Sequence, residues 1–176
     1  CKNGDNLVGN EQRWMANNSV VWFEEPSDQN VEKQMREMVD GMRGEPGIFS
    51  RLNANKIKPS RRKESVFGTN PCGEINLRPY EFCNLSTAIA RPDDTLETLK
   101  EKIEVATIIG TIQSIATNFP GLRDIWRKNC EEERLLGVDI NGWLDTPILR
   151  PNKHLAETLQ LLRNHAVETN KKYAKM

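Results

Sequence analysis

Residues 68–75 read GTNPCGEI and place an amide, a thiol and a carboxylate, from Asn70, Cys72 and Glu74, at every second position. In an extended backbone the side chains i, i+2 and i+4 point to the same side, so we expect these groups to emerge together. The intervening proline lacks a backbone donor and the intervening glycine lacks a side chain, which disfavours the interior of a sheet. The stretch therefore predicts an extended loop that presents three polar groups to a cavity.

The chemistry of this trio favours a neutral thiol. A carboxylate beside a thiol opposes formation of the thiolate, because like charges repel, and this disfavours ordinary Cys/His nucleophilic catalysis. A neutral thiol can instead lose a hydrogen atom, which leaves the neighbouring carboxylate free to act as a general base. Cys83 follows Cys72 by eleven residues. If the intervening turn returns it to the same cavity, it would supply reducing hydrogen and end in a disulfide.

Other interpretations of these cysteines stay open. Burial as small hydrophobic side chains is the commonest fate of a free cysteine, and composition alone favours it. Half a zinc site is a further alternative, although the chain has neither a CxxC motif nor clustered histidines. The chain could also be a non-catalytic nucleotide-binding or assembly module. Such a module would have no use for a radical-capable thiol beside a base.

Composition limits the partners and the compartment. The 176 residues include 25 Lys and Arg against 25 Asp and Glu, a net charge of zero, which argues against binding to nucleic acid or an anionic membrane. No apolar run approaches the roughly 18 residues that cross a bilayer, and no signal-peptide pattern is present, which indicates the cytoplasm. The chain opens on Cys1 and stops at Met176 inside a helical pattern, so we expect a fragment of a longer protein.

Strand and helix patterns alternate, which indicates an α/β protein. Residues 1–93 are expected to be mainly loop and strand, and residues 94–176 mainly helix. A basic run at 55–65 and the surroundings of Cys130 are expected to be solvated surface. The predicted strands are Ser19–Phe23, a short one at 48–53, and 81–90, buried on both faces; the predicted helices are 27–44, with a methionine stripe in the core, 94–119, 121–136 and 152–173.

Six segments of the chain resemble a known family in their order and spacing. They resemble the large catalytic subunit of ribonucleotide reductases, and the proline after Asn70 is most like the adenosylcobalamin-dependent class, particularly its monomeric ribonucleoside-triphosphate reductases. The resemblance implies a ten-stranded α/β barrel with the quoted stretch as a central finger loop, and residues 1–176 as a fragment of that one catalytic domain. The matching segments are NEQRWMANNSVVW (10–22), GEPGIF (44–49), NPCGEI (70–75), EFCNLS (81–86), LLGVDINGWLDTPIL (135–149) and ETNKKYAKM (168–176).

The resemblance also implies roles for matched positions. Cys72 would become the thiyl radical that takes the 3′-hydrogen of the substrate ribose. Glu74 would accept the 3′-hydroxyl proton, and Asn70 would hydrogen-bond the substrate hydroxyls. Cys83 would be one half of the redox-active pair that reduces the sugar. The specificity loop, which relays the identity of the effector, would comprise Asn3, Gly4, Asp5, Asn6, Gly9, Asn10 and Gln12.

Partners and cofactor follow from the same resemblance. It implies adenosylcobalamin as cofactor, no directly bound metal, and a ribonucleotide substrate, an allosteric nucleotide effector and thioredoxin as partners, without nucleic acid or membrane. In the family the partner of Cys83 lies upstream of the position of Cys1, and neither Cys1 nor Cys130 matches it. The C-terminal cysteine pair that exchanges with thioredoxin is not matched either. We therefore expect the isolated chain to be inactive.

Overall fold

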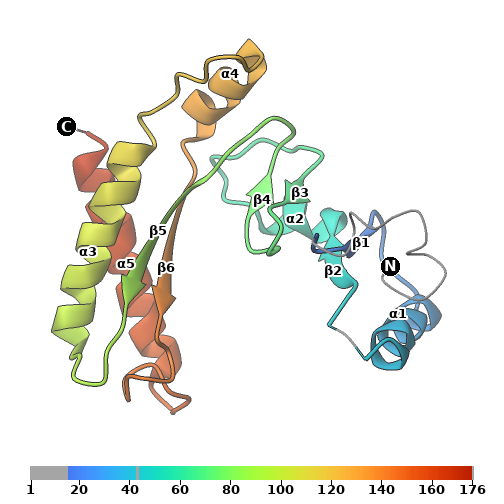
Figure 1. Cartoon of the computed structure of the whole chain (residues 1–176), viewed down its shortest axis with the longest axis horizontal. Coiled ribbons are helices and arrows are strands. Elements are labelled where there is room, and N and C mark those ends of the chain that lie inside the picture. The colour runs from blue at the N-terminus through green and yellow to red at the C-terminus, as the bar shows by residue number, and fades with distance from the viewer. Residues whose placement is uncertain (1–15, 43, 176) are drawn as a thin grey trace. The chain divides into compact units, whose positions relative to one another are not determined.

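Two compact units make up the chain, Cys1–Pro79 and Tyr80–Met176, in a computed structural model that describes residues 16–42 and 44–175. Both units are mixed α/β, and each contains a pair of parallel strands joined through helical structure (Figure 1). Parallel neighbours need such a crossover, because a tight hairpin can join only antiparallel strands. No helix among the described residues is long and apolar enough to cross a membrane.

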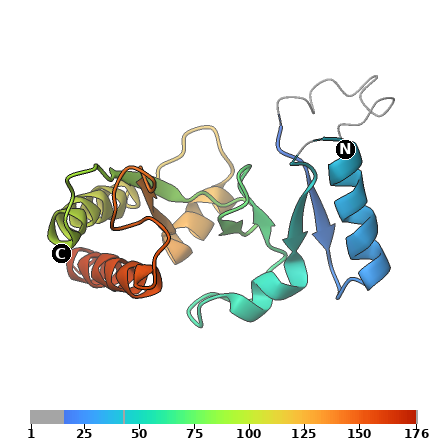
Figure 2. The same ribbon diagram turned by 90° about the horizontal axis from the view of Figure 1, so that it is seen from below.

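The first unit begins with a β-α-β arrangement. Strand β1 (Ser19–Trp22) pairs in parallel with β2 (Gly47–Ser50), so that Ser19 lies opposite Gly47 and Trp22 opposite Ser50. Helix α1 (Asp28–Asp40) connects the two strands and lies beside them (Figure 2). A Cβ atom at Gly47 would lie 2.8 Å from the Ser19 hydroxyl oxygen, which explains the glycine at this register position. The strand predicted at residues 19–23 is thereby confirmed.

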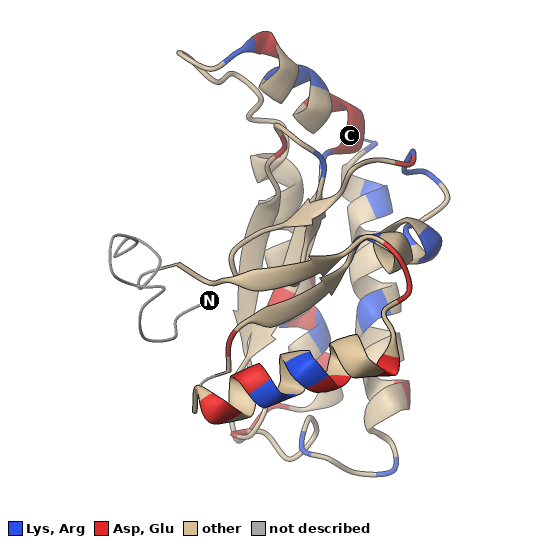
Figure 3. Ribbon diagram, turned by 90° about the vertical axis from the view of Figure 1, so that its right-hand side faces the viewer, with Lys and Arg blue, Asp and Glu red and all other residues tan. Residues whose placement is uncertain are grey.

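Helix α1 begins where the sequence predicts but ends at Asp40, before residue 44, and its apolar stripe is covered only in part. The Ser27 side chain caps the helix by accepting the Asn30 amide at 3.3 Å, and Gly41 follows its last residue. Acidic and basic residues follow one another along this helix (Figure 3). Met35 and Val39 are exposed while Gln34 is buried. The methionine stripe is therefore not core, because the two described strands leave much of it uncovered.

The short strand predicted at 48–53 is half right. It ends at Ser50, whose side chain accepts the Asn53 amide and caps helix α2 (Arg51–Ile57). Strands β3 (Gly68–Thr69) and β4 (Asn76–Leu77) then form a two-residue antiparallel ladder. Residues 70–75, with Asn70, Cys72 and Glu74, lie between them.

The second unit places two helices against a parallel strand pair. Strands β5 (Asn84–Ile89) and β6 (Leu136–Asn141) pair with Asn84 opposite Leu136 and Ile89 opposite Asn141. Between them run α3 (Leu96–Gln113) and α4 (Asp124–Glu133), and α5 (Leu155–Tyr173) ends the unit. Helix α3 contacts both strands and α5. Its approach to the strands is close at Gly110, where a Cβ atom would collide with the Leu136 side chain.

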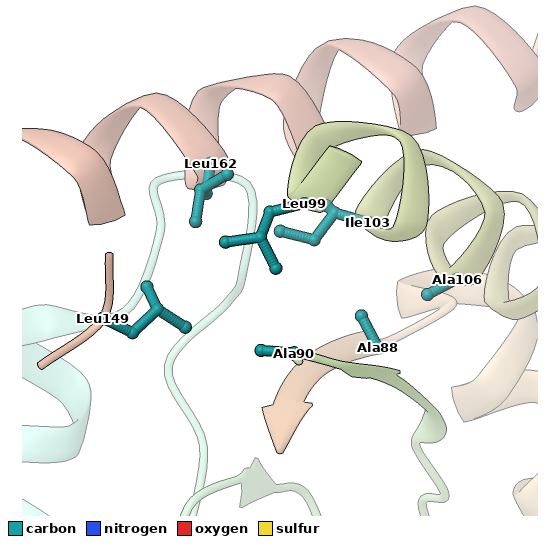
Figure 4. Packing of buried hydrophobic residues seen from close by; sticks show 7 residues of the cluster. All are labelled: Ala88, Ala90, Leu99, Ile103, Ala106, Leu149 and Leu162. Carbon is teal, nitrogen blue, oxygen red and sulfur yellow. The ribbon is translucent and has the colours of Figure 1, made fainter. Parts of the chain in front are cut away.

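The hydrophobic core of this unit lies between β5, α3 and α5. Leu162 from α5 reaches toward Leu99 and Ile103 on α3, while Ala88 and Ala90 approach from the strand side (Figure 4). Small alanine side chains on the strand let the larger helix side chains fill the space. The buried members of the core cluster are Ala88, Ala90, Leu99, Ile103, Ala106, Leu149 and Leu162.

Three expectations for this unit need correction. Strand β5 is not buried on both faces, because Leu85 and Ile89 are each 49% exposed. Strand β6 occupies residues for which the sequence predicted the end of a helix followed by turns. Helix α3 ends at Gln113 instead of near residue 119. The sequence did not predict β6 because Gly137 is typical of a chain break. In the structure this glycine lies against Leu85 of the neighbouring strand, where a Cβ atom would be 2.7 Å from the leucine side chain.

Candidate functional site

A compact turn, residues 70–75, joins β3 to β4. The amide of Gly73 donates to the Asn70 carbonyl at 3.1 Å, and the Ile75 amide donates to Asn70 Oδ1 at the same distance. The Asn70 amide closes the turn with a longer bond to the Ile75 carbonyl, 3.4 Å. Gly73 has φ +87°, a left-handed conformation that favours glycine. The extended loop expected from the alternating pattern is therefore wrong, because the chain reverses direction within these residues.

The turn brings two of the predicted site residues into direct contact. Asn70 Nδ2 donates to Glu74 Oε1 at 2.6 Å, a charge-assisted hydrogen bond if the carboxylate is ionised. Cys72, at the tip between them in sequence, is a free and exposed thiol. Burial as a small hydrophobic side chain therefore does not describe Cys72. The arrangement offers a carboxylate oriented by an amide, and an accessible thiol two residues away.

Two arginines and a buried phenylalanine hold the chain on either side of the turn. Arg51 Nε donates to the Phe67 carbonyl at 2.7 Å, and Arg62 Nη1 donates to the Asn76 carbonyl at 2.8 Å. The Arg62 guanidinium also lies 4.7 Å from the centre of the fully buried Phe67 ring. Arg62 itself is buried. The basic run around it is therefore not all solvated surface, as its composition had indicated, since this arginine fixes the strand that follows the turn.

A further contact reaches the turn from the segment before β1. Asn17 Nδ2 donates to the Pro71 carbonyl at 2.7 Å, across 54 positions in the sequence. Beside this bond lies a cavity of about 560 Å³ lined by Ala16, Asn17, Ser19, Thr69, Asn70 and Pro71. None of these side chains is charged, so the cavity suits a ligand rich in neutral hydrogen-bonding groups. Asn17 could not be recognised from the sequence, because no motif signals a side chain whose partner is a distant backbone carbonyl.

The remaining predicted cysteine lies in the second unit. Cys83 is half-buried and precedes the first residue of β5. Asn70, Cys72 and Glu74 belong to the first unit, so a meeting of Cys83 with the turn stays a prediction. Cys130 was expected at the surface but is buried, and its sulfur accepts the Phe82 amide at 3.4 Å.

The predicted effector loop lies outside the described residues. Its residues, Asn3 to Gln12, precede the first described position, Ala16. Within the part of the chain that the structure describes, no three His, Cys, Asp or Glu side chains gather as metal ligands would.

Comparisons with known proteins agree on one enzyme class. An adenosylcobalamin-dependent ribonucleoside-triphosphate reductase from Levilactobacillus brevis is 29% identical over 170 aligned residues, which cover 92% of this chain and 21% of the relative. The enzyme of the same name from Euglena gracilis is 27% identical over 143 residues, covering 75% of this chain and 18% of the relative. A vitamin B12-dependent ribonucleoside-diphosphate reductase from Mycobacterium tuberculosis is 41% identical over 44 residues.

The matches to the two triphosphate reductases cover most of this chain but only a small part of each relative. The chain spans about a fifth of the length of the two triphosphate reductases. No family model matches the chain. No solved structure matches it. The chain is thus similar to a region of B12-dependent ribonucleotide reductases, and the names of those relatives include both triphosphate and diphosphate reductases.

Proposed function

We propose that the chain is part of the catalytic domain of an adenosylcobalamin-dependent ribonucleotide reductase, and that the turn 70–75 carries its radical chemistry. The observation that carries this proposal is the 2.6 Å bond from Asn70 to Glu74 on the turn whose tip is the exposed Cys72. The ten-stranded barrel and the preference for triphosphates belong to the same proposal. Similarity to the triphosphate reductases over most of the chain supports both.

The proposed reaction assigns one step to each group. The Cys72 thiol gives up its hydrogen atom, and the resulting thiyl radical takes the 3′-hydrogen of a bound ribonucleotide. Glu74 then accepts the 3′-hydroxyl proton, a role that suits a carboxylate already held by the Asn70 amide. The 2′-hydroxyl takes a proton from one thiol of a pair that includes Cys83 and leaves as water. The second thiol gives a hydrogen atom to C2′, and the pair becomes a disulfide as one further electron passes to the sugar. Glu74 then returns its proton to the 3′-oxygen, and Cys72 returns the 3′-hydrogen, which regenerates the thiyl radical.

The polar cavity beside the turn supports a sugar or base as the bound group. Its lining carries amides and hydroxyls without a charged side chain, so it offers no counter-ion for phosphates. The phosphates of the substrate, the allosteric nucleotide and thioredoxin would bind elsewhere in the full protein. A volume of about 560 Å³ falls within the range of small-ligand pockets.

Adenosylcobalamin would supply the initial radical in the full protein. Three cavities lined by described residues have volumes of about 390, 500 and 560 Å³. Cavities of this size take small ligands, and a corrin with its nucleotide tail and adenosyl group is considerably larger. These cavities do not fit the cofactor, so no step of the proposal depends on residues here that bind it.

Substitution of Cys72 by serine tests the proposal. Serine keeps the size and polarity of the side chain but does not form a radical at the potential of a thiol, so Cys72→Ser should abolish nucleotide reduction. The measurement is deoxyribonucleotide formation by the protein as its gene encodes it, supplied with ribonucleoside triphosphate, adenosylcobalamin and a thioredoxin system. Circular dichroism should be unchanged, since the side chain is exposed. Normal turnover by this variant would defeat the proposal.

A non-catalytic nucleotide-binding module is the second candidate. The uncharged cavity next to the turn is the observation that favours this candidate, because a ligand can bind there without being converted. In that case the protein would bind nucleotide equally well with serine or cysteine at position 72. It would also form no deoxyribonucleotide.

A further inference from the structure

We propose that Asn17 is a positioning residue for the turn that carries Cys72. Its carboxamide ties the tip of that turn to the segment that leads into β1. The catalytic consequence rests on the proposed function, while the positioning itself does not.

Two kinds of hydrogen bond hold the turn: bonds between its own residues, and a bond to another segment of the chain. Asn70 makes the internal bonds, to Gly73, Glu74 and Ile75, and all of them lie within residues 70–75. Among the residues that the structure describes, the 2.7 Å bond from Asn17 to the Pro71 carbonyl is the one hydrogen bond between these residues and another segment. Internal bonds fix the shape of the turn, and the bond from Asn17 restrains its tip against the segment before β1, so that the internal bonds open less often.

The segment that carries Asn17 is itself anchored. The neighbouring Asn18 donates from Nδ2 to Glu45 Oε2 at 3.1 Å, and its carbonyl accepts the Gly47 amide at 2.8 Å. Gly47 is the first residue of β2, and Glu45 lies two residues before it. The two successive asparagines therefore have different roles. Asn18 fixes the segment to β2, and Asn17 connects that fixed segment to the turn.

The same carboxamide lines the cavity next to the turn. Asn17 and Pro71 both contribute to its wall, together with Asn70. A ligand in this cavity would therefore contact the tether and the turn at once. Displacement of a reacting group by about 1 Å can cost on the order of a hundredfold in rate, so a tether at this point affects the chemistry without touching the reacting atoms.

Amide exchange provides the structural test. Asn17→Asp removes the donor with almost no change in shape, and Asn17→Ala removes it without adding charge. In the 176-residue chain, exchange of the Gly73 and Ile75 amides with water, measured by NMR, should accelerate about fivefold in both variants, as expected for the loss of one hydrogen bond. The matched control is Asn129→Asp: this amide also donates to a distant backbone carbonyl, that of Tyr80 at 3.2 Å, but in the second unit. It should leave both exchange rates unchanged.

Kinetics of the protein as its gene encodes it provide the second readout. Asn17→Ala should lower kcat about tenfold or more. The rise in KM for the nucleotide, which reports the lost contact of Asn17 with a ligand in the cavity, should be smaller than the fall in kcat, because the main role of the residue is to position the turn. Exchange rates at Gly73 and Ile75 that equal those of the wild type in both Asn17 variants would overturn the inference. If the rates rise but the wild-type protein forms no deoxyribonucleotide, the proposed function fails and the positioning role of Asn17 stands.

Discussion

Asn70 determines the local conformation of the candidate site. Its side chain accepts the Ile75 amide and donates to Glu74, so a single carboxamide both closes the turn and orients the carboxylate. The sequence identified Asn70, Cys72 and Glu74 as a group, but it did not predict the direct bond between Asn70 and Glu74. Alternation implies a common side only if the backbone is extended. Asn, Pro and Gly at positions one, two and four of NPCG are instead typical of a type I turn, and this preference prevailed.

Asp94 gives a residue-scale prediction about pH. Its side chain, 6% exposed, accepts hydrogen bonds from Lys102 Nζ at 2.6 Å and Thr98 Oγ1 at 2.8 Å. The Lys102 bond lowers the pKa of Asp94, with burial opposing it and Thr98 adding to it. A carboxyl with a lower pKa in the folded state stabilises the fold above its unfolded pKa, about 3.9, and loses that effect as the pH falls through the folded value.

The measurement is the free energy of unfolding against pH. Asp94→Asn should cost about 1.5–3 kcal/mol at neutral pH, the range for hydrogen bonds to a charged group. The difference from the wild type should shrink as the pH falls below about 4, because the wild-type carboxyl then becomes protonated as well. Urea unfolding across this range checks it, with the exposed neighbour Asp93→Asn as control. A difference that stays constant with pH would show that the charge of Asp94 plays no part.

At the scale of elements, the sequence predicted helix starts better than strand burial. The helices predicted to start at residues 27 and 94 begin within two residues of those positions, where Ser27 and Thr95 cap them, since a short polar side chain satisfies a free amide of the first turn wherever it occurs. Burial depends instead on which elements pack together. Leu85 and Ile89 gave β5 the composition of a core strand, yet one face of that strand is exposed among the described residues. A few neighbouring residues are therefore enough to predict where a helix begins, but not which face of a strand is buried.

Gly142 and Gly121 form a matched pair for an element-scale prediction. Both have φ +82°, but a Cβ atom at Gly142 would collide with the Ala90 carbonyl oxygen, while nothing lies within 4 Å of one at Gly121. Gly121→Ala should cost about 1 kcal/mol for the left-handed backbone alone. Gly142→Ala should cost about 2–4 kcal/mol, because the ends of β6 and β5 must separate as well. Urea unfolding of both variants measures the difference, and equal costs would contradict the close approach of the two strands.

At the scale of the whole chain, apolar surface is the main unexplained feature. The sequence predicts that the second half of α3 is apolar almost all round and should be buried in a longer protein. In the structure one side of this helix forms the core, whereas Ile109 and Ile112 are 56% and 62% exposed. The chain covers about a fifth of the triphosphate reductases that it resembles. A sequence of this length specifies its own core, but it cannot reveal which surface covers a second apolar face.

Two substitutions on α3 separate its apolar faces. Ile112→Lys changes an exposed residue and should alter the free energy of unfolding by less than about 0.5 kcal/mol, since surface substitutions seldom do more. It should also lower the binding of an apolar dye such as anilinonaphthalene sulfonate, because a charge interrupts the exposed patch. Ile103→Lys, at a position 2% exposed, should unfold the second unit, because it buries an unpaired charge. Chemical unfolding and dye fluorescence of the 176-residue chain distinguish the two. Severe destabilisation by Ile112→Lys would mean that this face is already covered in solution, and the division of α3 into a core side and a free side would then be wrong.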